Sequence, residues 1–208
     1  MSGNKFSVII PTMWYSDKIH RNLLKLNDCH EVGEIILIDN NTSLKPSYLD
    51  SITKLVYLPQ EENIFVNPAW NLGVKTSQYK NLCISNDDIE FEVDIFYWML
   101  SRIDVGVTGM WTGNYYGENV ELQYEREPIV GRPWGWGCLF FIHKDNWVEI
   151  DERLKIACGD DFLIRFVKGG GYMIRNMDLG HDEISITTRR GEFFGQQQED
   201  IKLWESQF

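Results

Sequence analysis

The feature that most constrains the fold is a set of short apolar runs, each of which stops abruptly at polar or turn-forming residues. The runs lie in the segments 6–10, 35–38 and 80–85, the last of which is apolar only at its centre, and these segments stop at Pro11-Thr12, Asp39 and Asn86-Asp87-Asp88. Their length and their content of Val, Ile and Leu are typical of strands that are buried on both faces of a parallel sheet. We therefore expect a parallel sheet whose strands end in polar side chains.

Helix signals lie between these runs. Ser16-Asp17 begins a segment that places Leu23 and Leu26 on one helical face. Asn67-Pro68 combines a capping residue with Pro at the first helical position. A further strand is expected at residues 53–58. This alternation of strand and helix predicts an open α/β sheet that is mostly parallel and is flanked by helices.

The second half of the chain has a mixed pattern. Strands are expected at residues 105–111, 137–143 and 172–176, and helices are expected to begin at Asp94 and Asp160. Residues 112–135 are rich in Gly, Asn, Tyr, Glu and Pro, and we interpret them as a long loop or a mobile flap. The polar tail from about Gly191 is expected to form a peripheral helix or to be partly frayed.

The bulk properties exclude several classes of protein. The length of 208 residues favours a single domain. No stretch approaches the roughly 18 apolar residues of a membrane span, and the N-terminus lacks a signal peptide. The 4 cysteines are scattered, which favours buried thiols in a reducing cytosol, so we expect a cytoplasmic protein. The net charge of −11 disfavours non-specific nucleic-acid binding, and Arg189-Arg190 is the only tight basic pair.

The polar strand ends indicate a ligand site, because ligands of open α/β sheets bind beyond the carboxyl ends of the strands. Pro11-Thr12, Asp39 and Asn86-Asp87-Asp88 are therefore candidates for holding a base, a ribose and a metal ion. The alternative is that Asp and Asn simply favour turns. No glycine-rich loop follows the first strand, which argues against a dinucleotide site or a P-loop.

Two acidic groups carry specific chemistry. The carboxylates of Asp87-Asp88 are the hard oxygen ligands that Mg²⁺ or Mn²⁺ takes together with substrate phosphates. Asp160-Asp161 stands at a predicted helix start, where it either caps the helix or supplies a general base for an acceptor hydroxyl. His181, which precedes two further acids, is either a structural or exposed side chain or a contact to metal or phosphate.

Six stretches of the chain, in this order, resemble the motifs of the family 2 glycosyltransferases. They are FSVIIPT (6–12), EIILIDNNTS (34–43), NIFVNPAWNLG (63–73), LCISNDDIEF (82–91), GWGCLFFIH (135–143) and GDDFLIR (159–165). The match covers most of the chain. The resemblance implies an α/β fold of the GT-A type, an open and mostly parallel sheet with a mixed-strand acceptor side. It further implies one domain over residues 1–208, with a nucleotide-sugar-binding half at 1–92 and an acceptor-binding and catalytic-base half at 93–208.

The resemblance also implies roles for residues on the donor side. Asp39 reads the nucleotide base, which is expected to be uracil. Pro11 and Thr12 contact the nucleoside, partly through backbone groups. The remaining residues expected to hold the nucleotide-sugar are Asn71, Asn86 and Asp87.

On the reacting side, Asp88 is the implied metal ligand, with His181 near the metal. Asp161 is the implied catalytic base, and Asp160 is oriented beside it. Trp134 and Trp136 are candidates for stacking on a sugar or acceptor face, with core packing as the alternative.

The implied activity is a metal-dependent, inverting transfer of a hexosyl or pentosyl group from a nucleotide-sugar, with a UDP-sugar favoured and Mn²⁺ or Mg²⁺ as the cofactor. Phe65, Trp70 and Leu163 depart from the family pattern and leave the sugar and the acceptor open. A saccharide or glycan is the default acceptor. A hydroxymethylated base of phage DNA is a second candidate acceptor, which the negative charge counts against. Two different activities stay open as well: a non-catalytic nucleotide-sugar-binding module and a nucleotidyltransferase.

Overall fold

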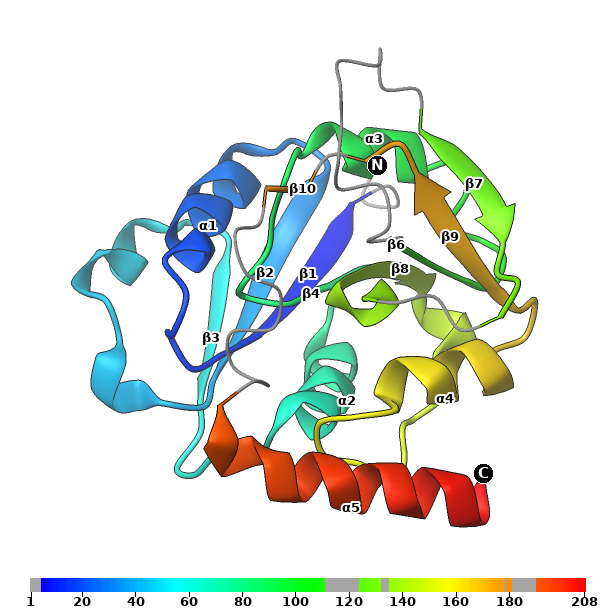
Figure 1. Ribbon diagram of the computed structural model, residues 1–208. Helices are drawn as coiled ribbons and strands as arrows, with labels where there is room; N and C mark the ends of the chain where they lie inside the picture. Colours follow the sequence, from blue (N-terminus) through cyan, green and yellow to red (C-terminus); the bar gives the residue numbers. More distant parts are fainter. Residues whose placement is uncertain (1–4, 111–123, 132–134, 178, 181–189) are drawn as a thin grey trace.

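The computed structural model describes residues 5–110, 124–131, 135–177, 179–180 and 190–208. Its strands are β1 (Phe6–Thr12), β2 (Val32–Asp39), β3 (Leu55–Pro59), β4 (Asn81–Ser85), β5 (Glu90–Phe91), β6 (Val107–Met110), β7 (Glu125–Pro128), β8 (Leu139–His143), β9 (Gly171–Arg175) and β10 (Leu179–Gly180). Its α-helices are α1 (Lys18–Asp28), α2 (Val66–Thr76), α3 (Asp94–Met99), α4 (Gly159–Phe166) and α5 (Gly191–Gln207). These elements form an open sheet with helices on both faces (Figure 1).

The eight strands of the main sheet lie in the order β3-β2-β1-β4-β8-β6-β9-β7, and β10 pairs with β5 in a separate ribbon. The first half of the sheet is parallel, as expected, since β1 pairs in parallel with β2 and β4 and β2 pairs in parallel with β3. Every residue of β1 is buried, which is why this strand is mostly apolar in sequence and shows no alternation of polar and apolar residues. The carboxyl ends of β1, β2 and β4 therefore meet at one edge.

The second half of the sheet is mixed. β8 runs antiparallel to both β4 and β6, while β9 is parallel to β6 and antiparallel to β7. Residues 125–128 were expected to lie in a loop, and this expectation is wrong, because they form the edge strand β7. The sequence of this strand is polar and ends in Pro, so it lacks the apolar alternation that marks a strand. Residues 112–123 and 132–134 of the expected loop lie outside the described residues.

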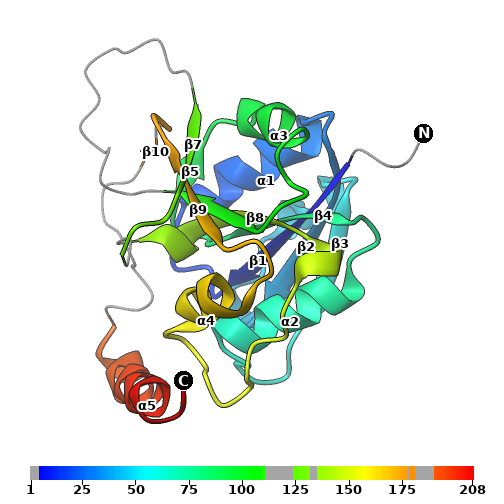
Figure 2. The same ribbon diagram turned by 90° about the vertical axis from the view of Figure 1, so that its right-hand side faces the viewer.

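Helices cover both faces of the sheet (Figures 1 and 2), and two apolar cores hold them there. One core lies between the sheet and α1 with α3, and the other lies between the sheet and α2 with α4. α2 approaches β1 so closely that a Cβ atom at Gly73 would lie 2.3 Å from Cγ2 of Ile9. This contact explains a glycine in the interior of a helix, where it otherwise costs stability.

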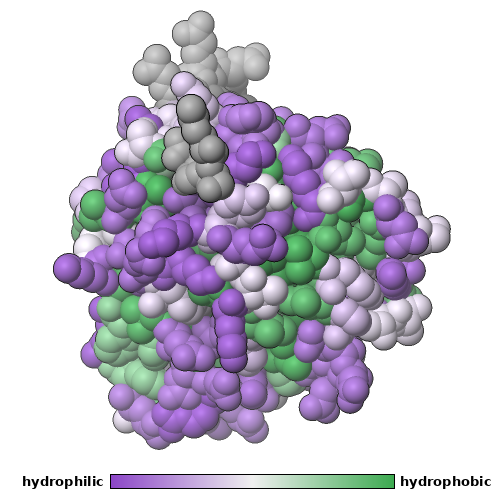
Figure 3. Space-filling model, turned by 180° about the vertical axis from the view of Figure 1, so that it is seen from behind, coloured by the Kyte–Doolittle hydropathy of each residue, from purple (hydrophilic) through white to green (hydrophobic). Residues whose placement is uncertain are grey.

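α5 lies along the outside of α2 and α4 (Figure 2). Phe208 stands at its C-terminal end, and the ring of this residue packs on Phe162 of α4, with 5.4 Å between the ring centroids. The tail was expected to form a peripheral helix or to fray, and the structure has the helix. From behind, polar residues cover most of the surface and apolar residues appear in separate areas (Figure 3). Within the described ranges, no helix is both long enough and apolar enough to cross a membrane.

Candidate functional site

A pocket of about 220 Å³ opens at the carboxyl edge of β1 and β4. Its walls come from the ends of several strands, from the starts of α2 and α4 and from α5. The lining residues are Pro11, Thr12, Met13, Asn40, Asn63, Phe65, Val66, Trp70, Asn86, Asp87, Asp88, Gly135, Gly137, Cys138, Ile156, Asp160 and Phe193. The sheet thus brings together five of the expected donor-side and metal-binding residues: Pro11, Thr12, Asn86, Asp87 and Asp88.

A hydrogen bond joins two of these strand ends. Thr12 Oγ1 donates to Asp87 Oδ2 over 2.7 Å, and the backbone N–H of Met13 approaches the same oxygen at 3.4 Å. The hydroxyl oxygen of Thr12 in turn accepts the backbone N–H of Trp14 at 2.9 Å. This chain of bonds fixes the orientation of the Asp87 carboxylate at the wall of the pocket.

The pocket carries excess negative charge. Asp87 and Asp88 are 7% and 4% exposed, and burial together with the neighbouring Asp88 carboxylate raises the pKa of Asp87 to about 7. Burial, with the added fields of Asp88 and Asp160, also raises the pKa of Cys138 to about 12. A cation bound beside these acids would relieve their repulsion.

The donor set suits a divalent ion that shares its coordination with a ligand. Among the residues that the structure describes, no three His, Cys, Asp or Glu side chains are grouped as a complete metal site. Mg²⁺ and Mn²⁺ commonly take one or two carboxylates and complete their shell with phosphates and water. Asp87 and Asp88 fit that pattern. His181, the other expected ligand, lies outside the described residues, as does Trp134.

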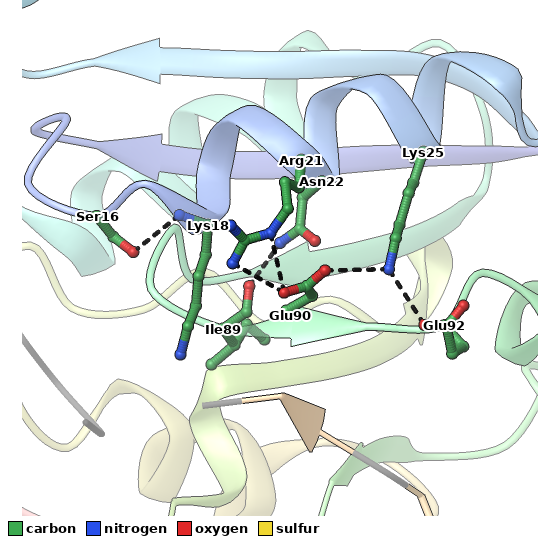
Figure 4. A network of polar contacts seen from close by, with 8 residues as sticks. All are labelled: Ser16, Lys18, Arg21, Asn22, Lys25, Ile89, Glu90 and Glu92. Carbon is green, nitrogen blue, oxygen red and sulfur yellow. Dashed lines mark hydrogen bonds and ion pairs between the residues drawn. The ribbon is translucent and has the colours of Figure 1, made fainter. Parts of the chain in front are cut away.

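Hydrogen bonds and ion pairs join the segment after Asp88 to α1, and they hold the acidic part of the pocket wall in place (Figure 4). Asn22 Nδ2 donates to the carbonyl oxygen of Ile89 at 2.6 Å. Glu90 pairs with Arg21 at 3.0 Å and with Lys25 at 3.2 Å. The hydrogen bond from Arg21, together with that from Lys25, lowers the pKa of Glu90 against the opposing effect of burial.

Of the second acidic pair, Asp160-Asp161, only Asp160 lines the pocket, whereas Asp161 was the expected base. Asp160 lines the pocket and packs on Gly137, where an added Cβ atom would lie 2.9 Å from Asp160 Oδ2. Asp161, the residue expected to be the base, is absent from the lining. Because α4 begins at Gly159, consecutive side chains in its first turn point in different directions. The geometry therefore favours Asp160 as the carboxylate that meets a ligand.

The loop before α4 is held from α5. Asp200 is 1% exposed, and its Oδ2 atom accepts the backbone N–H groups of Lys155, Ile156 and Ala157 at 3.0, 2.6 and 2.8 Å. Its other oxygen accepts a hydrogen bond from Gln196 Nε2 at 2.9 Å. This carboxylate satisfies three backbone donors of a loop that contributes Ile156 to the pocket and leads directly into Asp160.

The same loop is held from α2. Asn67 Nδ2 donates to the carbonyl oxygens of Leu154 and Ala157, and the Asn67 backbone N–H donates to Lys155. A Cβ atom at Gly159 would lie 2.1 Å from Asn67 Oδ1, so this position requires glycine. Asn67 was expected to cap a helix, and its side chain instead fixes a distant loop.

Three expected ligand contacts lie outside the pocket lining. Asp39 is 0% exposed, and its two oxygens accept the Tyr57 hydroxyl at 2.6 Å and the Asn41 N–H at 2.9 Å. Burial, together with this bond to Asp39, raises the pKa of Tyr57. Asn71 pairs with the backbone of Ile150 through both its amide nitrogen, at 2.8 Å, and its oxygen, at 3.1 Å. Both side chains make structural bonds with the protein itself.

Trp136, the third of these contacts, is a core residue, so the expectation that it stacks on a sugar is wrong. The side chain is 0% exposed, and its Nε1 atom donates to the carbonyl oxygen of Tyr172 at 2.8 Å. Its ring is stacked on Phe140, with 5.4 Å between the centroids. Core packing is therefore the role of this side chain.

The pocket also contains residues that the sequence did not single out. Asn40 follows Asp39 and lines the pocket, and its Oδ1 accepts the Ile64 N–H at 3.2 Å. Asn63 lines it as well, and Phe193 reaches it from α5. The two asparagines carry a recognisable signal, since they lie at a strand end and in a turn. Phe193 carries none, because nothing in the sequence of the tail marks the face that it presents.

Comparison with known proteins identifies the fold. A scan against protein-family models found no matching family, and a search of curated proteins found no match. Among solved structures, S. aureus TarS 1–349 matches with a TM-score of 0.59 and 18% identity, over 81% of this chain and 57% of that chain. GalNAc-T7 with UDP, GalNAc and Mn²⁺ matches with a TM-score of 0.57 and 16% identity, over 85% of this chain and 43% of that chain. A second structure of TarS 1–349, in complex with UDP, has a TM-score of 0.54 and 14% identity, over 81% and 57%.

The chain therefore spans about half the length of these solved structures. The present chain shares the GT-A fold of these structures. The expected fold is confirmed.

Proposed function

We propose that this protein is a metal-dependent glycosyltransferase that moves a sugar from a UDP-linked donor to a hydroxyl group of a saccharide. The observation that carries the proposal is the meeting of Thr12, Asp87-Asp88 and Asp160 in one pocket at the carboxyl edge of the sheet. The UDP and the GalNAc in the structures of the fold neighbours support the donor and acceptor classes. Residues 1–92 then supply most of the donor side, and residues 93–208 supply the acceptor side and the catalytic base.

The donor is held by the polar part of the lining. Pro11, Thr12 and Asn86 are close to the nucleoside and its ribose in this proposal. Asn40, in place of Asp39, makes the direct contact to the nucleotide base, because Asp39 is buried while Asn40 lines the pocket. Asp39 and Asn71 contribute by fixing the surrounding backbone.

Asp88, with Asp87 beside it, would hold a divalent cation. When bound, the cation supplies positive charge that stabilises the diphosphate as it departs. The Mn²⁺ in the GalNAc-T7 structure supports a divalent ion, and the choice between Mn²⁺ and Mg²⁺ is a matter for titration. His181 is a further candidate ligand on sequence grounds alone.

The reaction is a single displacement with inversion at the anomeric carbon. The acceptor oxygen forms a bond to this carbon, and the bond from the carbon to the diphosphate oxygen breaks on the opposite side. The acceptor proton passes to the carboxylate of Asp160, and the nucleoside diphosphate leaves with the bonding electron pair. Asp160 is preferred to Asp161 as the base because it lines the pocket.

A saccharide acceptor is retained in preference to DNA. The fold neighbours lend a DNA acceptor no support. Of the basic pair at 189–190, Arg189 lies outside the described residues, and the guanidinium of Arg190 lies over the ring of Tyr15 at 3.8 Å from its centroid. The net charge of −11 further disfavours a polyanionic acceptor.

The test is a panel of UDP- and GDP-linked sugars incubated with saccharide acceptors and with Mn²⁺ or Mg²⁺. We expect UDP release that depends on the metal and rises with an acceptor. D160N should lower turnover roughly 10²- to 10⁴-fold, the usual contribution of a general base, while D161N should retain more activity. Binding of UDP without turnover on any acceptor would instead indicate a binding module, and no binding of any donor would reject the proposal.

A further inference from the structure

Phe65 has a backbone conformation that is almost confined to glycine. It directly precedes α2 and has φ 66° and ψ −176°. A side chain in this region is crowded against its own backbone, so a bulky aromatic residue there is strained. Strain of this kind persists only where the surroundings enforce it, and it is often found at ligand sites.

Two asparagines of the pocket enforce the conformation. The Phe65 N–H donates to Asn63 Oδ1 at 2.8 Å, and the N–H of the preceding Ile64 donates to Asn40 Oδ1 at 3.2 Å. Asn40, Asn63 and Phe65 all line the pocket. The strained residue is therefore part of the pocket wall, and the hydrogen bonds that hold it come from the same wall.

The ring of Phe65 meets a second ring from a distant part of the chain. Phe193 of α5 is 8% exposed and lines the pocket. The two rings are in edge-to-face contact, with centroids 6.4 Å apart and planes at 85°. Neither residue belongs to the two apolar cores that hold the helices on the described sheet. Glycine would suit the backbone at position 65 better, so core packing gives no reason for an aromatic ring there.

The chemistry of this side of the pocket differs from that of the acidic side. The Phe65 ring, with the Phe193 ring nearly perpendicular to it, makes this part of the wall apolar, and the amides of Asn40 and Asn63 carry hydrogen-bond donors and acceptors beside it. The carboxylates of Asp87, Asp88 and Asp160 belong to other segments of the wall. A planar heterocycle with donors and acceptors on its edge matches the aromatic and amide side, whereas a metal-bound diphosphate matches the acidic side.

We propose that Phe65, supported by Phe193, is a specificity-determining residue that binds the flat face of the donor's nucleobase. The inference rests on the proposed function, because it takes the ligand to be a nucleotide-sugar. The strain at Phe65 is retained since the ring makes a ligand contact that glycine cannot make. α5 is thus part of the donor site through Phe193.

The experiment compares F65G, F65A, F65Y and N176G with wild type. Melting temperatures are measured without ligand, and dissociation constants are measured for UDP with Mn²⁺ and for uridine by calorimetry. F65G should melt at or above the wild-type temperature, because glycine relieves the backbone. It should bind both UDP and uridine roughly tenfold more weakly or worse, the usual loss when a stacked aromatic ring is removed.

The other three variants separate the effect of the ring from that of the backbone. F65A should lose affinity as F65G does but gain no stability, because alanine keeps the strained Cβ atom. N176G changes another residue with positive φ, 58°, that lies outside the pocket lining, and it should leave both dissociation constants unchanged. Tyrosine in F65Y should retain affinity within a few fold, because it keeps the ring.

Three results would overturn the inference. Wild-type affinity of F65G for UDP and uridine would show that the ring makes no base contact. A large fall in the melting temperature of F65G would show that the ring is a structural residue. Weaker binding of a UDP-sugar with unchanged binding of UDP and uridine would place the ring against the sugar. If wild type itself binds no UDP, the proposed function fails first, and that result is distinct from equal binding by wild type and F65G.

Discussion

The carboxylate of Asp200 accepts a hydrogen bond of 2.6 Å from the backbone N–H of Ile156, and it does so from the interior of the last helix. The same oxygen also accepts the backbone N–H groups of the two residues that flank Ile156. One side chain therefore satisfies three donors of the loop that leads to Asp160. The position of Asp160, the proposed catalytic residue, therefore depends on α5, a helix that contributes no acidic side chain to the pocket.

Replacing Asp200 tests this dependence. D200A should lower the free energy of unfolding by about 2–5 kcal/mol, because it leaves three backbone N–H groups in a partly buried loop without their acceptor. Urea unfolding monitored by fluorescence measures the change. E199A, at the exposed neighbouring position on α5, is the control and should alter stability by less than about 0.5 kcal/mol. Equal stability of the two variants would show that the loop does not need the carboxylate.

Removing the Thr12 hydroxyl should weaken the link between β1 and the acidic cluster. T12V keeps the shape of the side chain but deletes the donor to Asp87, and it should cost about 1–3 kcal/mol of stability. T42V, at an exposed threonine, is the matched control. Denaturant unfolding of both variants gives the comparison, and a T12V protein as stable as T42V would contradict a stabilising role for this bond.

Asp88 should dominate metal binding. D88N removes a negatively charged ligand, and we expect Mn²⁺ affinity measured with UDP present to fall roughly 10- to 100-fold or more. Calorimetric titration with Mn²⁺ provides the measurement. E92Q, which neutralises an exposed acid on the same segment, should bind Mn²⁺ as wild type does. Similar losses in both variants would indicate a general effect of charge in place of a ligand at Asp88.

The Glu90 ion pairs predict a specific response to acid. Arg21 and Lys25 lower the pKa of Glu90 in the folded protein below its value in the unfolded chain. Its contribution to stability is therefore present above the unfolded pKa and is lost as the pH falls through the folded pKa. E90Q should be less stable than wild type near pH 6 by under about 1 kcal/mol, and the difference should shrink toward pH 3.

Urea unfolding at several pH values between 3 and 6 measures this difference between wild type and E90Q. E61Q, at an exposed glutamate in the turn after β3, is the control and should show no such convergence. A gap between wild type and E90Q that stays constant down to pH 3 would mean that the ion pairs do not contribute to stability.

The parallel half of the sheet was predictable because its central strands are buried along their length and stop at polar residues. Thr12 and Asp88 could be placed in the site for the same reason, since parallel strands end at one edge. β7 could not be predicted, because an exposed edge strand has no apolar pattern to mark it.

The remaining parts of the site depend on contacts between distant residues. Nothing near Asp200 or Phe193 indicates which loop or pocket they reach, because their partners come from other elements. Trp136 and Asp39 were predicted to bind a ligand, and their residue types are common in ligand sites. Both are instead buried and hydrogen-bonded to other parts of the protein. The sequence was sufficient to predict the edge of the sheet at which the pocket lies, and it was not sufficient to predict the direction in which each side chain points.

The residues that line the pocket extend along the sequence from Pro11 to Phe193, and this separation affects the order in which the site folds. On a ribosome, the strands that carry Thr12 and Asp88 emerge long before α5, so the sheet can begin to assemble while one wall of the pocket is still missing. Contacts between such distant segments form late, because the loop that joins them must first be ordered. Nucleotide binding should therefore be acquired only in the final stage of folding, and its appearance in a refolding experiment would mark the docking of the C-terminal helix.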